Sequence, residues 1–293
     1  MRRLHHFPLV TRHLSLGTVL LLLAAPCFIL SEVEGWAAWG TGGATCETQS
    51  EAAATTTLTC TLGTQNLEAG NVAVVTCATD NVSTTDGNSN DHSAVTDSGS
   101  NAYTKAYEFT EAGTGAGGGA TVSVHFSKLT TQLNSGSSTI TCNFASVTDK
   151  AMHLVKEFTV GAGNVVSVVG APQGEVSGGG DAGNLTVGGL TSAEYLWVRG
   201  IATESNAAVS MTATAGGLFA LPTAPTDGCN NTTGGGEASD MGACSEWDVA
   251  TATTNTSNPA LVDTSNDNAS VFVALEEAPP PAGRPPRRAM NID

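Results

Sequence analysis

The sequence predicts an all-β protein: a single large, jelly-roll-like β-sandwich of about twelve short antiparallel strands with Gly- and Asn-rich loops. Three observations predict this fold class. Charged residues make up only 13% of the chain, helix formers are sparse, and there are 34 glycines. Short segments rich in Thr and Val alternate between apolar and polar residues, as half-buried strands do. No long window carries apolar residues at helical spacing.

The alternation is clearest in a hairpin near the middle of the chain. Residues 103–109 place three aromatic side chains on one side, and residues 120–126 alternate again. Between them, residues 111–119 are rich in glycine and poor in apolar side chains. We therefore expect two strands joined by a flexible loop.

Further strands are expected wherever the alternation or a short apolar run recurs between turn residues. The run at 72–79 is largely apolar, which makes it the best candidate for a central strand. The other expected strands cover residues 55–62, 138–145, 152–160, 165–169, 185–187, 194–202, 209–214, 246–253 and 270–275.

Both ends of the chain differ from this body. Residues 1–38 combine a basic start with an apolar run that is shorter than the ~20 residues of a membrane-spanning helix. They are predicted to be a secretion signal, or else an uncleaved N-terminal anchor or the product of a misassigned start codon. The β-sandwich domain is expected over residues 39–278. Residues 279–293 are rich in Pro and Arg, which predicts a disordered tail.

The charge of the chain argues against one class of partner. The formal net charge is −16, and residues 38–278 hold five basic residues against 24 acidic ones. Proteins bind phosphate backbones through clustered Lys and Arg. We therefore expect no nucleic-acid partner, and solubility is the simplest explanation of the acidity.

Of the seven cysteines, one lies in the predicted leader. The remaining six are an even number after a secretion signal, which predicts a disulfide framework in an oxidising compartment. One pairing is predicted, between Cys229 and Cys244, because a bridge there would close a glycine-rich loop and contribute about 3 kcal/mol. Cys60, Cys77 and Cys142 fall within expected strands and could equally be small buried apolar residues.

The strongest candidate for direct ligand binding is the strand at 194–202. Tyr195, Trp197 and Arg199 share one face of it. Exposed aromatic rings beside a guanidinium group suit the apolar face of a sugar ring. The alternative is that this is the core face of the sandwich, with Arg199 at its rim.

A weaker candidate is a calcium loop, and calcium is the only cofactor that the sequence suggests. Asp86, Asn88 and Asn90 stand at alternate positions, and Asp97 follows eleven residues after Asp86. This spacing is similar to that of oxygen ligands in calcium-binding loops. However, the sixth position of the loop is Asp91 instead of glycine and no helices flank it, so a solvated turn is the alternative.

No catalytic motif stands out in the sequence. Three histidines follow the predicted leader, His92, His125 and His153, and none belongs to a His-Glu-x-x-His motif. His125 lies between Ser123 and Ser127 on the polar face of its strand, where a solvated histidine is expected. There is also no Gly-x-Ser-x-Gly nucleophile elbow, so a hydrolase is the least favoured hypothesis.

Four segments occur in a recognisable order: EAGNVAVV at 68–75, AVTDSGSNAYTK at 94–105, GGATVSV at 118–124 and NASVFVALE at 268–276. This order resembles a β-sandwich module that recurs in environmental bacteriophage structural proteins and in secreted bacterial surface proteins. Asn101-Ala-Tyr stands here where such modules usually carry Gly-Asn-Thr. The resemblance implies a jelly-roll-like sandwich used for attachment or as a part of the virion, and it implies no catalytic residues.

These observations lead to a first hypothesis of a non-catalytic extracellular, cell-surface or virion-surface protein that attaches to a glycan or to a protein partner. The alternative is a structural decoration or fibre subunit that assembles with itself. A secreted hydrolase is the third. Contact with a membrane is expected only through an uncleaved N-terminus. The predicted leader favours the secreted form of the module over the virion form.

Overall fold

The computed structural model describes residues 39–42, 46–50, 55–80, 85–87, 90–115, 118–147, 150–177, 182–204, 209–216, 218–222, 228–231, 241–262 and 267–280. This part of the chain forms sixteen strands and no helix, and every pairing of strands is antiparallel. The predicted all-β class is therefore confirmed. The predicted leader, residues 1–38, lies outside the described residues.

The strands belong to three larger sheets and one small pair. The six-stranded sheet has the order β1 (Gly40–Thr41), β9 (Lys150–Thr159), β4 (Val72–Asp80), β7 (Gly118–Lys128) and β6 (Thr104–Gly115), with β2 (Glu47–Ser50) also paired to β9. The five-stranded sheet has the order β10 (Val165–Ser177), β16 (Asp267–Ala278), β11 (Leu185–Glu204), β14 (Met241–Ser257) and β13 (Cys229–Asn231). The three-stranded sheet has the order β3 (Thr55–Thr61), β8 (Thr139–Val147) and β5 (His92–Asp97), and β12 (Ser210–Thr212) pairs with β15 (Ala260–Val262).

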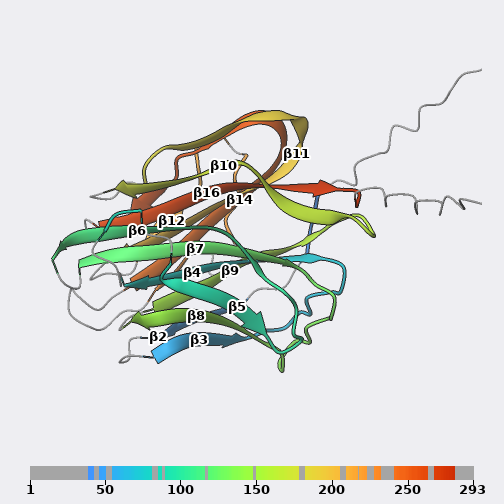
Figure 1. Ribbon diagram of the computed structural model, residues 1–293, viewed down its shortest axis with the longest axis horizontal. Helices are drawn as coiled ribbons and strands as arrows, with labels where there is room; N and C mark the ends of the chain where they lie inside the picture. Colours follow the sequence, from blue (N-terminus) through green and yellow to red (C-terminus); the bar gives the residue numbers. More distant parts are fainter. Residues whose placement is uncertain are drawn as a thin grey trace, which may run out of the picture. The chain divides into compact units, whose positions relative to one another are not determined.

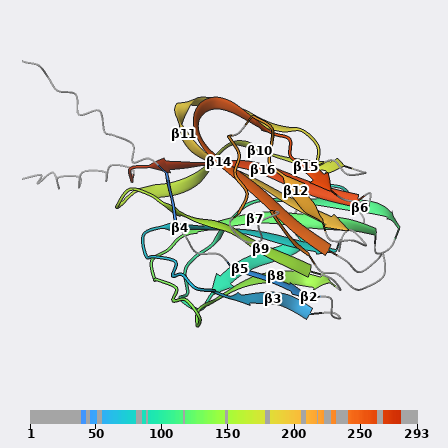
Figure 2. The same cartoon turned by 180° about the vertical axis from the view of Figure 1, so that it is seen from behind.

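These sheets are stacked as layers, with the six-stranded sheet in the middle (Figures 1 and 2). One apolar core lies between the six- and five-stranded sheets and includes Val74, Val122 and Val198. A second core lies between the six- and three-stranded sheets and includes Val75 and Ile140. The β-sandwich prediction is thus confirmed in its class, but the stack has one layer more than a two-sheet sandwich.

Strand β4 shows why the middle layer has the sequence it has. Its residues from Val72 to Thr79 are all buried, because alternate side chains enter the two different cores. In a strand that is buried on both faces, the side chains of both faces are mainly apolar, so the sequence does not alternate between apolar and polar residues. The nearly continuous apolar run VAVVTCAT is therefore what this position requires, and the prediction of a central strand is confirmed.

The central hairpin differs from the expectation in one respect. Residues 111–119 were expected to form a loop, but β6 continues to Gly115 and β7 begins at Gly118. The register of the pair shifts between Glu111 and Gly115. Glycines therefore serve here as strand residues at an irregular pairing instead of forming a long connection.

All six cysteines of the β domain form disulfides. Cys229 is bonded to Cys244, its directly opposed residue on β14, so the predicted pairing is confirmed. Cys77 is bonded to Cys142, which ties the six-stranded sheet to the three-stranded sheet. Cys46 is bonded to Cys60.

Cys60, Cys77 and Cys142 are buried as expected, but they are paired rather than free. Three disulfides indicate an oxidising, extracellular-type environment. Among the described residues, no helix has the length and apolar character needed to cross a membrane.

Candidate functional site

The predicted ligand face on β11 lies inside the protein. Tyr195, Trp197 and Arg199 are 1%, 0% and 0% exposed. The ring of Trp197 stacks on that of Phe272 with centroids 6.0 Å apart, and Phe219 lies over the same Phe272 ring. The prediction of exposed ligand contacts here is therefore wrong. The alternative is only partly right: this face is apolar and buried, but it belongs to a separate cluster with Phe219, whereas Leu196 and Val198 on the opposite face enter the core between the sheets. Arg199 is fully buried instead of lying at a rim.

Arg199 is held in that interior by main-chain and hydroxyl oxygens. One of its terminal nitrogens, Nη2, donates hydrogen bonds to the carbonyl oxygens of Ala182 and Gly183. The same nitrogen donates to the hydroxyl of Ser270 at 2.9 Å. The guanidinium group thus fastens the segment before β11 to strand β16, which is a structural role.

The predicted calcium ligands serve local turns where the structure describes them. The Oδ1 atom of Asp97 accepts hydrogen bonds from the amides of Gly99 and Asn101, at 2.9 and 3.0 Å. The Oδ1 atom of Asp86 accepts one from the amide of Ala112 at 2.8 Å. These contacts support the turn alternative.

The other two predicted ligands contribute no further support for calcium. Asn90 is exposed, and Asn88 lies outside the described residues. In the part of the chain that the structure describes, no group of three or more His, Cys, Asp or Glu side chains could hold a metal ion.

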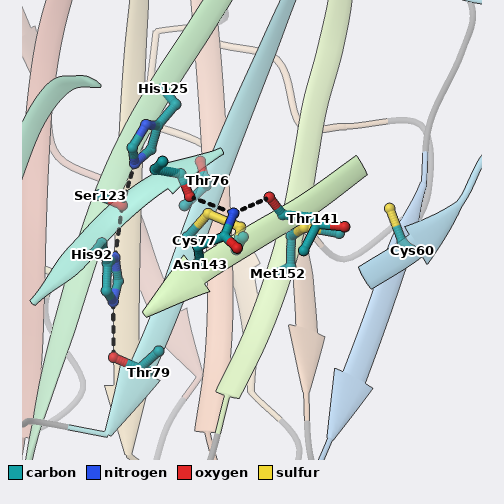
Figure 3. The surroundings of a disulfide bond; sticks show 12 residues. Cys60, Thr76, Cys77, Thr79, His92, Ser123, His125, Thr141, Asn143 and Met152 are labelled. Carbon is teal, nitrogen blue, oxygen red and sulfur yellow. Dashed lines mark hydrogen bonds between the residues drawn. A yellow bond between two sulfur atoms is a disulfide. The ribbon is translucent and has the colours of Figure 1, made fainter. Parts of the chain in front are cut away.

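A row of buried polar side chains runs beside the Cys77–Cys142 disulfide (Figure 3). The hydroxyl of Ser123 lies 2.7 Å from His92 Nδ1 and 3.0 Å from His125 Nε2. His92 Nε2 lies 2.8 Å from the hydroxyl of Thr79. The row connects β5 of the three-stranded sheet with β4 and β7 of the six-stranded sheet.

Glu108 extends this polar region toward the surface. It accepts hydrogen bonds from the amides of Asp91 and His92, at 2.6 and 3.2 Å, and so caps the start of β5. Its Oε2 atom also forms an ion pair with Lys105 Nζ at 2.5 Å. Burial raises the pKa of the Glu108 carboxyl, and the hydrogen bond from Lys105 opposes that rise.

A serine beside a histidine raises the question of catalysis. A catalytic serine–histidine pair needs a substrate path and a group that orients the second ring nitrogen. Ser123, His92 and His125 are at most 1% exposed, and the second ring nitrogen of His92 faces Thr79. Glu108 binds main-chain amides instead of an imidazole, so the row is best explained as a structural link between sheets.

Burial also determines the protonation of the two histidines. It lowers the pKa of His125 to about 3, with the nearby positive charge of Lys105 as a smaller cause. It lowers the pKa of His92 as well, with additional repulsion from His125 and Lys105. Both imidazoles are therefore neutral near pH 7. The expectation that His125 is solvated is wrong, because the three-stranded sheet covers the polar face of β7.

An acidic cluster lies at one end of the space between the six- and five-stranded sheets. Asp80 on β4 and Glu111 on β6 come from one sheet, and Glu204 on β11 and Asp267 on β16 come from the other. Burial, together with the smaller effect of neighbouring carboxylates, raises the pKa values of Glu111 and Glu204 to about 7. These carboxyls therefore change charge close to neutral pH.

The most regular exposed surface is the outer side of the three-stranded sheet, which we call the threonine face. Its inner side enters the second core, so the alternate side chains point outward. Register places residues of all three strands in two rows across the sheet, for example Thr59, Thr141 and Thr96, and Thr61 pairs with Thr139 in a third row. The face consists of Thr57, Thr59, Thr61, Ala94, Thr96, Thr139, Thr141 and Asn143.

Side-chain hydrogen bonds order this face. The hydroxyl oxygens of Thr59 and Thr141 lie 2.8 Å apart. Asn143 Nδ2 donates to the hydroxyl of Thr96 and to the carbonyl oxygen of Ala94, both at 3.3 Å. None of the eight residues is charged, although the chain has a net charge of −16. The alternation in 55–61 was visible in the sequence, but the assembly of the three strands was not.

A shallow pocket of about 550 Å³ lies where β11 bends, at the register shift between Gly188 and Ala193. Thr191, Ser192 and Thr251 are among the residues that line it. Glu194, which also lines it, accepts a hydrogen bond from the amide of Trp39 at 2.7 Å. The one carboxylate of this pocket is thus already engaged by the main chain.

Comparisons with protein-family models, with curated proteins and with solved structures find no match to this chain.

Proposed function

We propose that this protein is a non-catalytic attachment protein that works outside the cytoplasm, secreted or at a cell surface. The observation that carries the proposal is the threonine face, a regular, exposed and uncharged sheet surface on a strongly acidic protein. Acidic side chains elsewhere repel other acidic molecules, whereas this face does not. An acidic molecule that approaches this face therefore meets no repelling side chain of the face itself.

The disulfides support the extracellular part of the proposal. They tie β4 to β8, β13 to β14, and Cys46 to the edge strand β3. Such links resist unfolding where no cytoplasmic chaperones operate, and they persist in oxidising compartments. Because disulfides restrict movement between the strands they link, this scaffold suits attachment through a fixed sheet surface better than a function that requires large conformational changes.

The polar groups that could suggest a hydrolase have other uses. The Ser123 hydroxyl hydrogen-bonds to His92 and to His125 in the interior, and Glu108 caps a strand. We therefore favour binding over turnover as the basis of function.

The proposal is tested by applying the oxidised, folded protein to an array of glycans and surface proteins and measuring retention. Retention on a defined class of ligand, without any change in that ligand, supports attachment. Consumption of the ligand would contradict a non-catalytic role. Concentration-dependent assembly with no retention, measured by light scattering, would contradict attachment and support a structural subunit of a particle or cell surface.

A further inference from the structure

We propose that the partner of the threonine face is a neutral, hydroxyl-rich polysaccharide presented as a repeating surface. The inference rests on the proposed attachment function and adds the location of the contact and the chemistry of the partner. Four properties of the face lead to it: its regularity, its lack of charge, its hydrogen-bonding groups and its small area.

The regularity follows from the sheet. Neighbouring strands lie about 4.8 Å apart and alternate residues on one strand are about 6.7 Å apart, so the outward side chains form a grid. Threonine is branched at Cβ and has few rotamers, which keeps each hydroxyl in a defined direction. No side chain of the face is larger than that of Asn143, so none projects far above the grid. A grid of this kind matches a partner that itself repeats.

The absence of charge restricts the partner to neutral molecules. The face offers no cation to a phosphate, sulfate or carboxylate, and the net charge of −16 repels polyanions over a longer range. Nucleic acids and acidic polysaccharides are therefore disfavoured. A cationic partner would gain more from the acidic surfaces elsewhere than from this one.

The hydrogen-bonding groups match those of sugars. A threonine hydroxyl donates one hydrogen bond and accepts two, and a sugar hydroxyl does the same. The Thr59–Thr141 contact satisfies only part of this capacity, and Thr59 is exposed to solvent. The methyl groups beside the hydroxyls offer apolar contact to the C–H faces of sugar rings.

The area explains why the partner is an extended surface and not a single globular protein. Three strands of 7, 9 and 6 residues cover only about 300 Å². A specific protein–protein interface buries about 800 Å² on each partner. A small contact can nevertheless hold a protein on a repeating polymer, because a released copy finds an equivalent site at once.

The test measures how much oxidised full-length protein sediments with insoluble neutral polysaccharides, namely cellulose and chitin. We expect retention on at least one of them. Thr59→Lys and Thr141→Lys place a large, strongly hydrated cation on the grid and should each reduce retention about tenfold. Thr59→Val, which keeps the shape and removes the hydroxyl, should also reduce it.

The matched control is Thr186→Lys. Thr186 and Thr256 form the same hydroxyl contact at 2.8 Å, but on neighbouring strands β11 and β14 outside the threonine face. Thr186 is exposed, so this variant adds the same charge and should leave retention unchanged. Thermal unfolding of each variant verifies its fold. If a lysine variant does not fold, Thr59→Val against Thr186→Val provides the same comparison.

The outcomes separate this inference from the proposed function. Retention that survives all the face variants would overturn the inference and leave attachment standing. Loss of all retention, together with no binding on the array, would overturn both. A third outcome is that the protein inhibits ice growth, measured as thermal hysteresis, and is not retained on polysaccharide. This would show that the grid orders water, and it would overturn the inference.

Discussion

Glu204 accepts a hydrogen bond from the backbone amide of Gly119, 2.8 Å away, and this contact joins the two sheets that enclose the first core. The acceptor belongs to β11 of the five-stranded sheet, and the donor belongs to β7 of the six-stranded sheet. The same carboxyl lies among Asp80, Glu111 and Asp267, whose negative charges oppose its ionisation. One side chain therefore links the sheets and also makes the link dependent on pH.

The first prediction concerns this acidic cluster. The pKa values of Glu111 and Glu204 are raised to about 7 in the folded protein. A raised carboxyl pKa means that the folded state binds more protons than the unfolded state, so stability falls as pH rises from about 4.5 to 7. Glu111→Gln and Glu204→Gln should therefore raise the melting temperature at pH 8 and change it little at pH 4.5.

Both carboxyls lie at the end of the space between the sheets, so solvent screening limits each effect to about 1 kcal/mol or less. Glu68→Gln, at an exposed side chain, serves as the control and should have no comparable effect. Melting curves measured from pH 4.5 to 8 test the prediction. A Glu204→Gln variant that melts lower than the parent at pH 8 would show that the hydrogen bond to Gly119 outweighs the repulsion.

The second prediction concerns the buried histidines and has the opposite sign. The pKa of His125 is lowered to about 3 by burial, so the unfolded state binds more protons at acidic pH. Stability should therefore fall as pH drops from about 6.5 toward 3. His125→Gln should lose less stability than the parent as the pH falls, because glutamine can still hydrogen-bond to the Ser123 hydroxyl and does not titrate. Denaturant unfolding at pH 7 and pH 4 measures the difference.

The third prediction concerns the substitution Ser123→Ala, which tests how much the row of buried polar side chains contributes to stability. The Ser123 hydroxyl meets ring nitrogens of both His92 and His125 in the interior. Its removal leaves two buried polar atoms without that partner, which should cost about 1–3 kcal/mol of the free energy of unfolding. Ser93→Ala, at an exposed serine of β5 in the three-stranded sheet, should cost much less. Equal losses in the two variants would mean that the row does not contribute to stability.

The fourth prediction compares two disulfides. Cys77–Cys142 closes a sequence separation of 65 and Cys229–Cys244 closes one of 15. The chain-entropy model predicts losses of about 4 and 3 kcal/mol when each pair is replaced by alanine. The larger loss should come with faster hydrogen exchange in β3, β8 and β5, because Cys77–Cys142 fastens that sheet to the middle layer. Exchange that speeds up throughout all layers equally would contradict this local role.

The sequence predicted the strands well because alternation is a local signal. The apolar run in β4 and the alternation in β7 follow from which side each residue faces. Layering could not be predicted in the same way, because a polar face can meet solvent or another sheet. Ser123 and His125 look solvent-facing in the sequence, but both are buried and Ser123 meets His92 of β5 in another sheet. The Cys77–Cys142 bond joins strands distant in the chain, so its pairing also depends on topology.

The same ambiguity applies to Tyr195 and Trp197, and it yields the last prediction. From the sequence, an aromatic face on a strand is compatible with a ligand site or with a buried cluster. Here it is a buried cluster, in which Trp197 contacts both Tyr195 and Phe272. Trp197→Ala should therefore cost about 3–5 kcal/mol of the free energy of unfolding. Thr59→Lys, on the exposed threonine face, should change it by no more than about 0.5 kcal/mol. Denaturant unfolding measures both, and a Trp197→Ala variant as stable as the parent would mean that this side chain is not part of the core.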